Sequence, residues 1–181
     1  MNQRGFTLLE TLVAIGILAV GIAGPIYMAS RSLVLAENAA NSLTASYLAQ
    51  EGLDFIRKQR DDAYFSDYEI SGGSPGSYWS YFMDSVATCV YPNWCGVNVH
   101  PLANGDPFTS VQKLNLVVKN NHELYSTEWG EGYSTTTPFT RRVQVTFDNA
   151  STYANVVSTV TWEFKGSSYS VTQSSILTPW L

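Results

Sequence analysis

The sequence has few charged residues and only two histidines. Asp, Glu, Lys and Arg make up 14% of the 181 residues, and the net charge is −5. No basic face that would bind nucleic acid is therefore expected. His100 and His122 have no nucleophile pattern, glycine-rich phosphate loop or ligand cluster around them, and the carboxylates form no paired arrangement. We therefore expect neither catalysis nor a bound metal or cofactor.

Cysteine is equally scarce, since Cys89 and Cys95 are the only two. If this part of the chain lies outside the membrane, an even count in an oxidising compartment favours a disulfide. Closing the loop would stabilise the fold by about 2.4 kcal/mol in the chain-entropy model, and would pin a turn at Pro92-Asn93-Trp94. Two free thiols are the alternative in reducing surroundings. A metal site would need more ligands than these thiols and a distant His100 provide.

Charge is absent from a long stretch near the N-terminus. Residues 11–30 contain no charged side chain, and at about 1.5 Å per residue such a helix can cross a hydrocarbon core of roughly 30 Å. Glu10 stands at the leading edge of this stretch. A carboxylate near hydrocarbon costs about 3 kcal/mol on insertion scales, so Glu10 is a functional candidate. The alternative is that its side chain merely reaches back to the lipid head groups.

Two ordinary interpretations of this stretch leave features unexplained. A secretory signal peptide would place basic Arg4 before an apolar core and a small-residue cleavage site near Gly21-Ile22-Ala23. Glu10 interrupts that core, and the helical pattern continues well past the supposed cut. A plain membrane anchor with Arg4 on the cytoplasmic side explains the length, but not Gly5-Phe6 or Glu10.

The residues Gly5-Phe6-Thr7-Leu8-Leu9-Glu10, followed by the apolar stretch to Gly24 and Pro25, resemble the N-terminus of type IV pilin and pseudopilin precursors. The resemblance implies that a prepilin peptidase cuts between Gly5 and Phe6 and methylates Phe6. The apolar helix would remain on the mature protein.

The same resemblance implies a role for Glu10, together with Thr7, in filament assembly. The Glu10 carboxylate would pair with the N-terminal amine of a neighbouring subunit and so favour one axial register. Other pilin or pseudopilin subunits, the prepilin peptidase and methyltransferase, and an inner-membrane assembly platform are the implied partners. The implied location is first the inner membrane, with one spanning helix and the C-terminal domain outside the cytoplasm, and then a pilus or pseudopilus.

The apolar stretch continues into an amphipathic helix. Gly24 and Pro25 predict a kink or local melting over residues 20–26, since proline removes a backbone donor and clashes with the preceding turn. Beyond Arg31, apolar residues recur at helical spacing to Ile56, and the basic residues after it favour a helix end at Asp61 or Asp62. The expected segments are a cleaved leader (1–5), a membrane or filament-core half (6–30), an amphipathic half (31–62) and a globular domain (63–181).

The globular domain has two contrasting parts. Residues 63–110 lack periodicity and predict irregular structure with one short element near residues 78–86. Their many aromatic side chains favour covering a core, with an adhesive surface as the alternative. Residues 111–178 alternate with period two and predict an antiparallel sheet of about four or five strands. The last hairpin turns at Lys165-Gly166-Ser167-Ser168, and the final strand shows a slip between Val171 and Ile176, which predicts a bulge or an edge position.

These elements predict an α+β fold in which the amphipathic half of the helix covers the apolar face of the sheet. That architecture matches the pilin fold. Residues 47–57 and the C-terminal strands also resemble PilV-type minor pilins and I-type pseudopilins. The predicted function is a structural filament subunit, most similar to a minor pilin or pseudopilin. The alternatives are a membrane-anchored periplasmic or surface binding module that forms no filament, and a major pilin.

Overall fold

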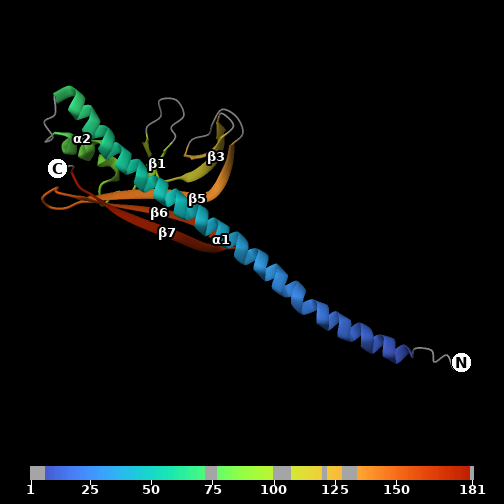
Figure 1. Cartoon of the computed structure of the whole chain (residues 1–181). Coiled ribbons are helices and arrows are strands. Elements are labelled where there is room, and N and C mark those ends of the chain that lie inside the picture. Colours follow the sequence, from blue (N-terminus) through green and yellow to red (C-terminus); the bar gives the residue numbers. More distant parts are fainter. Residues whose placement is uncertain (1–6, 72–76, 100–106, 120–121, 128–133, 180–181) are drawn as a thin grey trace. The chain divides into compact units, whose positions relative to one another are not determined.

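The computed structural model describes residues 7–71, 77–99, 107–119, 122–127 and 134–179 (Figure 1). It divides the chain into two compact units, Met1–Asn41 and Ser42–Leu181, which are described separately. Helix α1 (Leu8–Ser71) contributes to both. It ends at Ser71, so the predicted end at Asp61 or Asp62 is wrong: the residues that follow the basic cluster are still helical. The basic cluster therefore lies inside the helix and does not mark its end.

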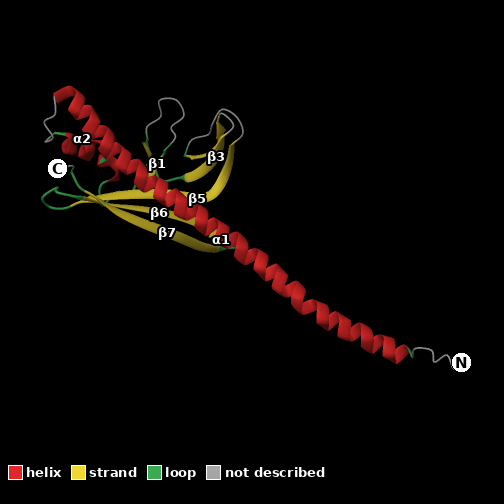
Figure 2. Cartoon of the chain, in the orientation of Figure 1, coloured by secondary structure: helices red, strands yellow, loops and turns green. Residues whose placement is uncertain are grey.

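The elements after α1 are short helices followed by strands (Figure 2). They are α2 (Tyr78–Ser85), the 3-10 helix η1 (Ala87–Cys89), β1 (Gly96–Val97), β2 (Phe108–Thr109), β3 (Lys113–Lys119), β4 (His122–Ser126), β5 (Ser134–Phe147), β6 (Ala154–Phe164) and β7 (Ser167–Leu177). The short element expected near residues 78–86 is confirmed as α2.

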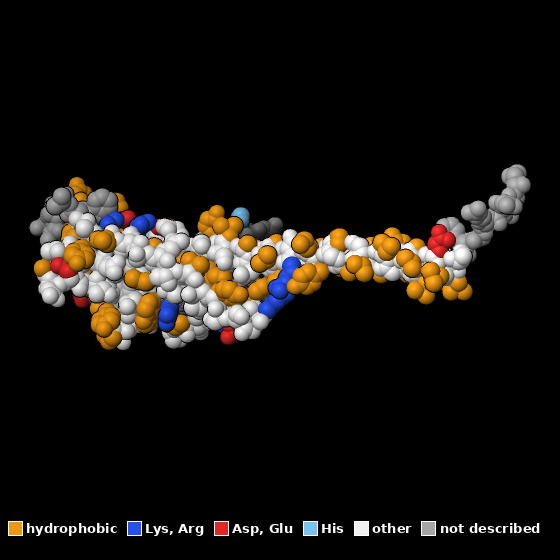
Figure 3. Space-filling view, turned by 90° about the horizontal axis from the view of Figure 1, so that it is seen from below, with side chains coloured by type: hydrophobic (Ala, Val, Ile, Leu, Met, Phe, Trp, Pro, Cys, Tyr) orange, Lys and Arg blue, Asp and Glu red, His pale blue; other side chains and the backbone are white. Residues whose placement is uncertain are grey.

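The described part of the first unit is helical from Leu8 onward, and its large apolar side chains are exposed. Leu9 is 74% exposed, Leu18 62% and Ile26 60%. Hydrophobic side chains are spread over this helical segment in the space-filling view (Figure 3). Within the described residues, one helix is long and apolar enough to cross a membrane, and none of its most apolar window is buried. Because exposed apolar surface is unfavourable in water, this segment requires lipid or other protein around it.

The helix continues through Gly24 and Pro25 without interruption. The local melting expected over residues 20–26 is therefore not observed. A proline removes only one donor from the helical ladder, and the neighbouring turns keep their helical bonds. A change of helix direction at this position remains a prediction.

The second unit contains an antiparallel five-stranded sheet in the order β4-β3-β5-β6-β7. Its strands β3, β5, β6 and β7 are labelled in Figure 1. β1 and β2 form a separate two-stranded pair. The β6–β7 hairpin turns at Lys165 and Gly166, both with positive φ, as its position predicted. β7 pairs with β6 in unbroken register from Ala154↔Leu177 to Phe164↔Ser167. The expected edge position of the last strand is confirmed, whereas the alternative of a bulge is wrong.

Residues 42–71 of α1 cover one face of the sheet, as the amphipathic pattern predicted. Leu53 and Ile56 pack in one buried cluster with Val143 and Val145 of β5. A second cluster joins residues nearer the start of this unit to the other end of the sheet: Ala45, Leu48, Ala49, Leu114, Phe139, Val160 and Trp162. Burying these side chains supplies the main stabilising term of the domain. The fold is a long N-terminal helix on an antiparallel sheet, consistent with the pilin fold.

Candidate functional site

Thr7 and Glu10 together form the start of α1. The backbone oxygen of Thr7 accepts hydrogen bonds from the N–H groups of Glu10 (3.0 Å) and Thr11 (3.2 Å). The Thr7 hydroxyl oxygen also accepts from the Glu10 N–H at 3.3 Å. Thr7 is therefore an N-cap residue, and Thr7-Leu8-Leu9-Glu10 has the spacing of a capping box. This capping role adds to the expected assembly role of Thr7, and its sequence signal is a threonine followed three residues later by a glutamate.

Glu10 has a local structural role as well as its proposed assembly role. A carboxylate in the first helical turn interacts favourably with the positive end of the helix dipole. Within the described part of the chain, no cation pairs with the Glu10 carboxylate, and the side chain is exposed. The carboxylate is therefore accessible to a cation from another molecule. Gly5 and Phe6, the residues of the expected cleavage and methylation, lie outside the described residues.

Gly24 and Pro25 lie farther along the same exposed helix. A Cβ atom placed on Gly16, Gly21 or Gly24 would meet nothing within 4 Å. These glycines therefore make no close contact inside the chain that requires the absence of a side chain. They leave a smooth helix surface that another helix can approach closely.

The geometry at the N-terminus agrees with a comparison to known protein families. Residues 1–24 match the model of the prokaryotic N-terminal methylation motif. This motif is the type IV pilin-like prepilin signal. It indicates a type IV pilin-like prepilin that a peptidase processes. The helix that follows the prepilin signal suggests membrane anchoring typical of prepilins. No significant match was found among curated proteins or among solved structures.

The two cysteines form a disulfide, as expected from their number. Both are buried, with Cys89 0% and Cys95 3% exposed. The turn inside the loop lies slightly earlier than expected. The Asn93 N–H donates to the Val90 oxygen at 2.9 Å, which closes a turn around the cis Tyr91-Pro92 bond. The thiols are therefore not free, and the disulfide encloses a turn from Val90 to Asn93.

The disulfide loop also covers part of one strand of the sheet. The Cys95 N–H donates to the Val143 oxygen at 3.0 Å, and the Val143 N–H donates back to the Cys95 oxygen at 2.8 Å. The Tyr91 N–H donates to the Val145 oxygen at 2.9 Å. The pairing of β3 with β5 extends only as far as Thr140. The loop thus satisfies backbone groups of β5 beyond the reach of β3.

A buried ion pair joins α1 to β5. The Arg141 guanidinium donates to the Glu51 carboxylate at 2.5 Å, to the Leu48 oxygen at 3.2 Å and to the Val97 oxygen at 2.8 Å. Burial lowers the pKa of Arg141, while the nearby negative charge of Glu51 opposes that shift. Arg141 alternates along the sequence onto the same strand face as Val143 and Val145, but no local pattern identifies Glu51 as its partner. An arginine among inward-facing valines was the signal that an acceptor had to lie opposite.

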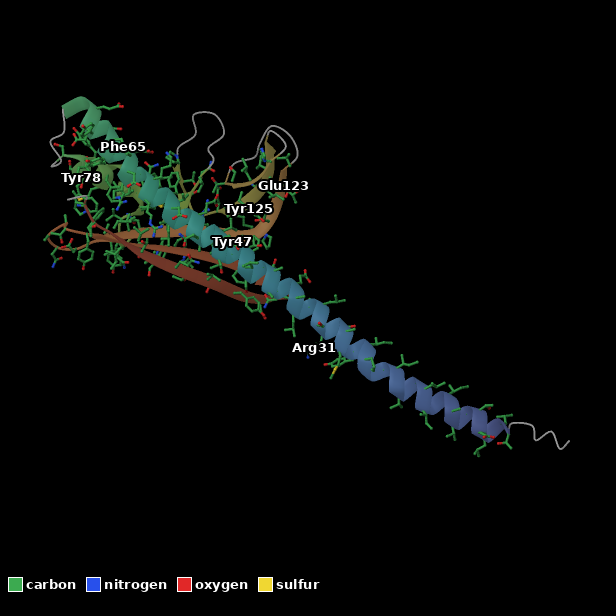
Figure 4. All side chains as sticks on the ribbon, viewed as in Figure 1. Arg31, Tyr47, Phe65, Tyr78, Glu123 and Tyr125 are labelled. Carbon is green, nitrogen blue, oxygen red and sulfur yellow. A yellow bond between two sulfur atoms is a disulfide. The ribbon has the colours of Figure 1, made fainter. Side chains whose placement is uncertain are left out.

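The aromatic residues of positions 64–94 divide between the core and the surface. Tyr78, Trp79 and Phe82 of α2 are 1%, 8% and 0% exposed, so the core-covering interpretation is confirmed for them. Tyr64 of α1 packs edge-on against Tyr78 with ring centroids 5.1 Å apart. Phe65 is 64% exposed and lies on the same helix (Figure 4). The remaining exposed aromatic residues of this region are Tyr68, Tyr81 and Tyr91.

Of the two histidines, the structure describes only His122. His122 is exposed on β4, and His100 lies outside the described residues. Among the residues that the structure describes, no group of three or more His, Cys, Asp or Glu side chains is arranged to hold a metal ion.

Proposed function

We propose that this chain is a minor pilin or pseudopilin, a structural subunit of a type IV pilus or of a type II secretion-like filament. The observation that carries the proposal is the prepilin signal at residues 1–24, joined directly to an apolar helix without cover in its own chain. A signal of this kind keeps the helix on the mature protein. A helix that is apolar on all sides can lie first in lipid and then among the helices of other subunits.

In this proposal the peptidase cuts between Gly5 and Phe6, and Phe6 becomes the methylated first residue. Glu10 then lies four residues from the new N-terminal amine. Its exposed carboxylate, without a cation partner among the described residues, would pair with the amine of a neighbouring subunit. Because an unpaired charge among apolar helices is costly, only registers that form this pair would be stable. Thr7 would hold Glu10 in the first helical turn.

The expected segments fit this role. The leader (1–5) would be removed, residues 6–30 would occupy the membrane and then the filament core, and the amphipathic half would carry the globular domain. The domain would lie outside the cytoplasm, where an oxidising compartment maintains the Cys89–Cys95 disulfide. The likeness of residues 47–57 and of the C-terminal strands to PilV-type minor pilins and I-type pseudopilins supports the minor-subunit role.

The deciding experiment is intact-mass and N-terminal peptide mass spectrometry of the chain produced with its native processing enzymes. We expect a mature chain that begins at Phe6 and carries one added methyl group. A chain that begins near Gly24 would mean removal of an ordinary signal peptide. That result would overturn the pilin proposal and favour a periplasmic or surface binding module.

A further inference from the structure

The two outer strands of the five-stranded sheet differ in how they are protected. β4 is short, with five residues, and carries the exposed residues His122 and Glu123. β7 has eleven residues, Ser167–Leu177, none of which is charged or a proline. It also has no bulge, since its register with β6 is continuous over its full length. Short length, charge, proline and bulges are the devices by which proteins prevent an edge strand from pairing with another chain.

Elsewhere in the same sheet, another segment of the chain pairs with the part of a strand that its neighbouring strand does not reach. The disulfide loop pairs with the part of β5 that β3 does not reach, through Tyr91 and Cys95. No comparable segment pairs with β7 within the described residues, where β6 is its only neighbouring strand. The alternate N–H and C=O groups of β7 that point away from β6 therefore lack a strand partner in the described part of the chain.

We propose that β7 is a docking edge for another subunit, which adds an extended segment to the sheet beside β7 as a sixth strand. This inference rests on the proposed filament function, because it names a contact between subunits of one assembly. A row of backbone donors and acceptors is matched best by the backbone of another strand.

The side chains of β7 define the chemistry of the incoming segment. On one face Gln173 donates to the Ser46 oxygen of α1 at 3.2 Å, and Ser175 accepts from Arg57 at 2.9 Å. On the opposite face Ser174 is exposed and Ile176 is 67% exposed. The segment that fits is therefore extended and free of proline, with an apolar side chain beside Ile176.

A second β7 strand is a poorer occupant. The contacts Ser46–Gln173, Arg57–Ser175 and Arg60–Thr178 show that α1 and β7 run in the same direction. Two β7 strands related by a two-fold axis would therefore set residues 42–71 of the two copies in opposite directions. Subunits of one helical filament contact one another head to tail and keep one direction. A different segment of the neighbouring subunit satisfies both requirements.

Amide hydrogen exchange of the full chain tests the proposal, measured once in detergent and once in filaments assembled with its partner subunits. We expect the β7 amides that point away from β6 to exchange about tenfold more slowly, or slower still, in the filament. Amides of β6 should change little. Unchanged exchange of β7 in filaments that contain the chain would overturn the docking edge and leave the filament role intact. Absence of the mature chain from the filaments would overturn both proposals.

A charged side chain on the edge provides a matched test. Ser174→Lys places a charge on the exposed face of β7, and Thr146→Lys places the same charge on the exposed face of the interior strand β5. We expect Ser174→Lys to reduce incorporation into filaments and to abolish the extra protection of β7, whereas Thr146→Lys should do neither. Equal behaviour of the two variants would contradict the proposal. So would a disulfide that joins two copies through Thr172→Cys, because it would identify the occupant as a second β7.

Discussion

Arg141 of β5 and Glu51 of α1 form an ion pair at 2.5 Å that joins the helix to the sheet across ninety residues of sequence. The Arg141 side chain is fully buried, and Glu51 is 29% exposed. Leu48 and Val97 supply carbonyl acceptors to the same guanidinium. These contacts tie the helical turn from Leu48 to Glu51 to β5.

Removing the acidic partner should destabilise the domain more than removing an exposed acid from the same helix. Glu51→Ala leaves a buried guanidinium without its carboxylate, and we expect a loss of roughly 2 kcal/mol in the free energy of unfolding. Glu69→Ala is the control, because Glu69 is exposed on α1. Urea unfolding of the full chain in detergent measures both. Replacing both partners with apolar residues, Glu51→Leu with Arg141→Met, should recover much of the loss, and a double variant as unstable as Glu51→Ala would contradict this account.

Gly52 should tolerate no side chain, because α1 approaches the sheet closely there. A Cβ on Gly52 would lie 2.7 Å from the Ser158 hydroxyl oxygen and 3.2 Å from Cδ of Arg141. We expect Gly52→Ala to lower the free energy of unfolding by about 1 kcal/mol, since overpacking outweighs the better helix propensity of alanine. Adding Ser158→Ala removes the closest contact and should restore most of the stability. Thermal unfolding of the two variants decides, and an equally unstable double variant would show that another contact is responsible.

Loss of the disulfide should weaken both the loop and the strand that it covers. Replacing Cys89 and Cys95 with alanine removes a cross-link worth about 2.4 kcal/mol in the chain-entropy model. Because Cys95 pairs with Val143 through two backbone bonds, the amides of that strand should also exchange faster. Urea unfolding and amide exchange measure the two effects. Unchanged exchange at Val143, together with lower stability, would show that the loop stays in place without its cross-link.

The Glu10 carboxylate should be required for assembly but not for anchoring. Glu10→Gln keeps the size of the side chain and removes the charge that would pair with a neighbouring N-terminal amine. We expect processing and membrane localisation to persist, while incorporation into filaments falls at least tenfold, equivalent to about 1.4 kcal/mol per subunit. Quantitative detection of the chain in sheared filaments provides the measurement. Glu37→Gln, at an exposed position farther along α1, is the control, and normal incorporation of Glu10→Gln would overturn the register argument.

Asp148 should make the domain sensitive to acid. Its carboxylate accepts hydrogen bonds from the N–H groups of Tyr153, Thr152 and Ala150 and from the Thr152 hydroxyl, and these bonds lower its pKa below the ordinary value of 3.8. A carboxylate whose pKa is lower in the folded state stabilises the fold above its unfolded pKa. That stabilisation is lost as the pH falls from about 3.8 through the folded pKa. Asp148→Asn should lack this part of the pH dependence, and urea unfolding between pH 5 and pH 2 measures it. At every higher pH the variant should be less stable than the parent chain by about the same amount. If the stability of the variant fell with pH as steeply as that of the parent chain, other carboxylates would be responsible for the acid sensitivity.

Several features of the fold and of the N-terminal site were predictable because they depend on residues close together in the sequence. The motif Gly5 to Glu10 and the uncharged stretch after it specify a processed, apolar helix. Alternation along residues 139–147 and 156–164 specifies strands with one apolar face, and that face requires the amphipathic helix as its cover. The even number of cysteines favoured a disulfide. Each of these inferences depends on local spacing or composition, which no tertiary contact has to supply.

Other features were decided only by packing. No local pattern pairs Arg141 with Glu51, because the two residues meet only once the helix lies on the sheet. The end of α1 at Ser71 was missed, since favourable charges at Arg57 and Arg60 are also tolerated inside a helix that tertiary contacts extend. The sequence alone predicted either a bulge or an edge position for the last strand. The continuous pairing of β7 with β6 excludes the bulge, because register is set by two strands together and not by either alone.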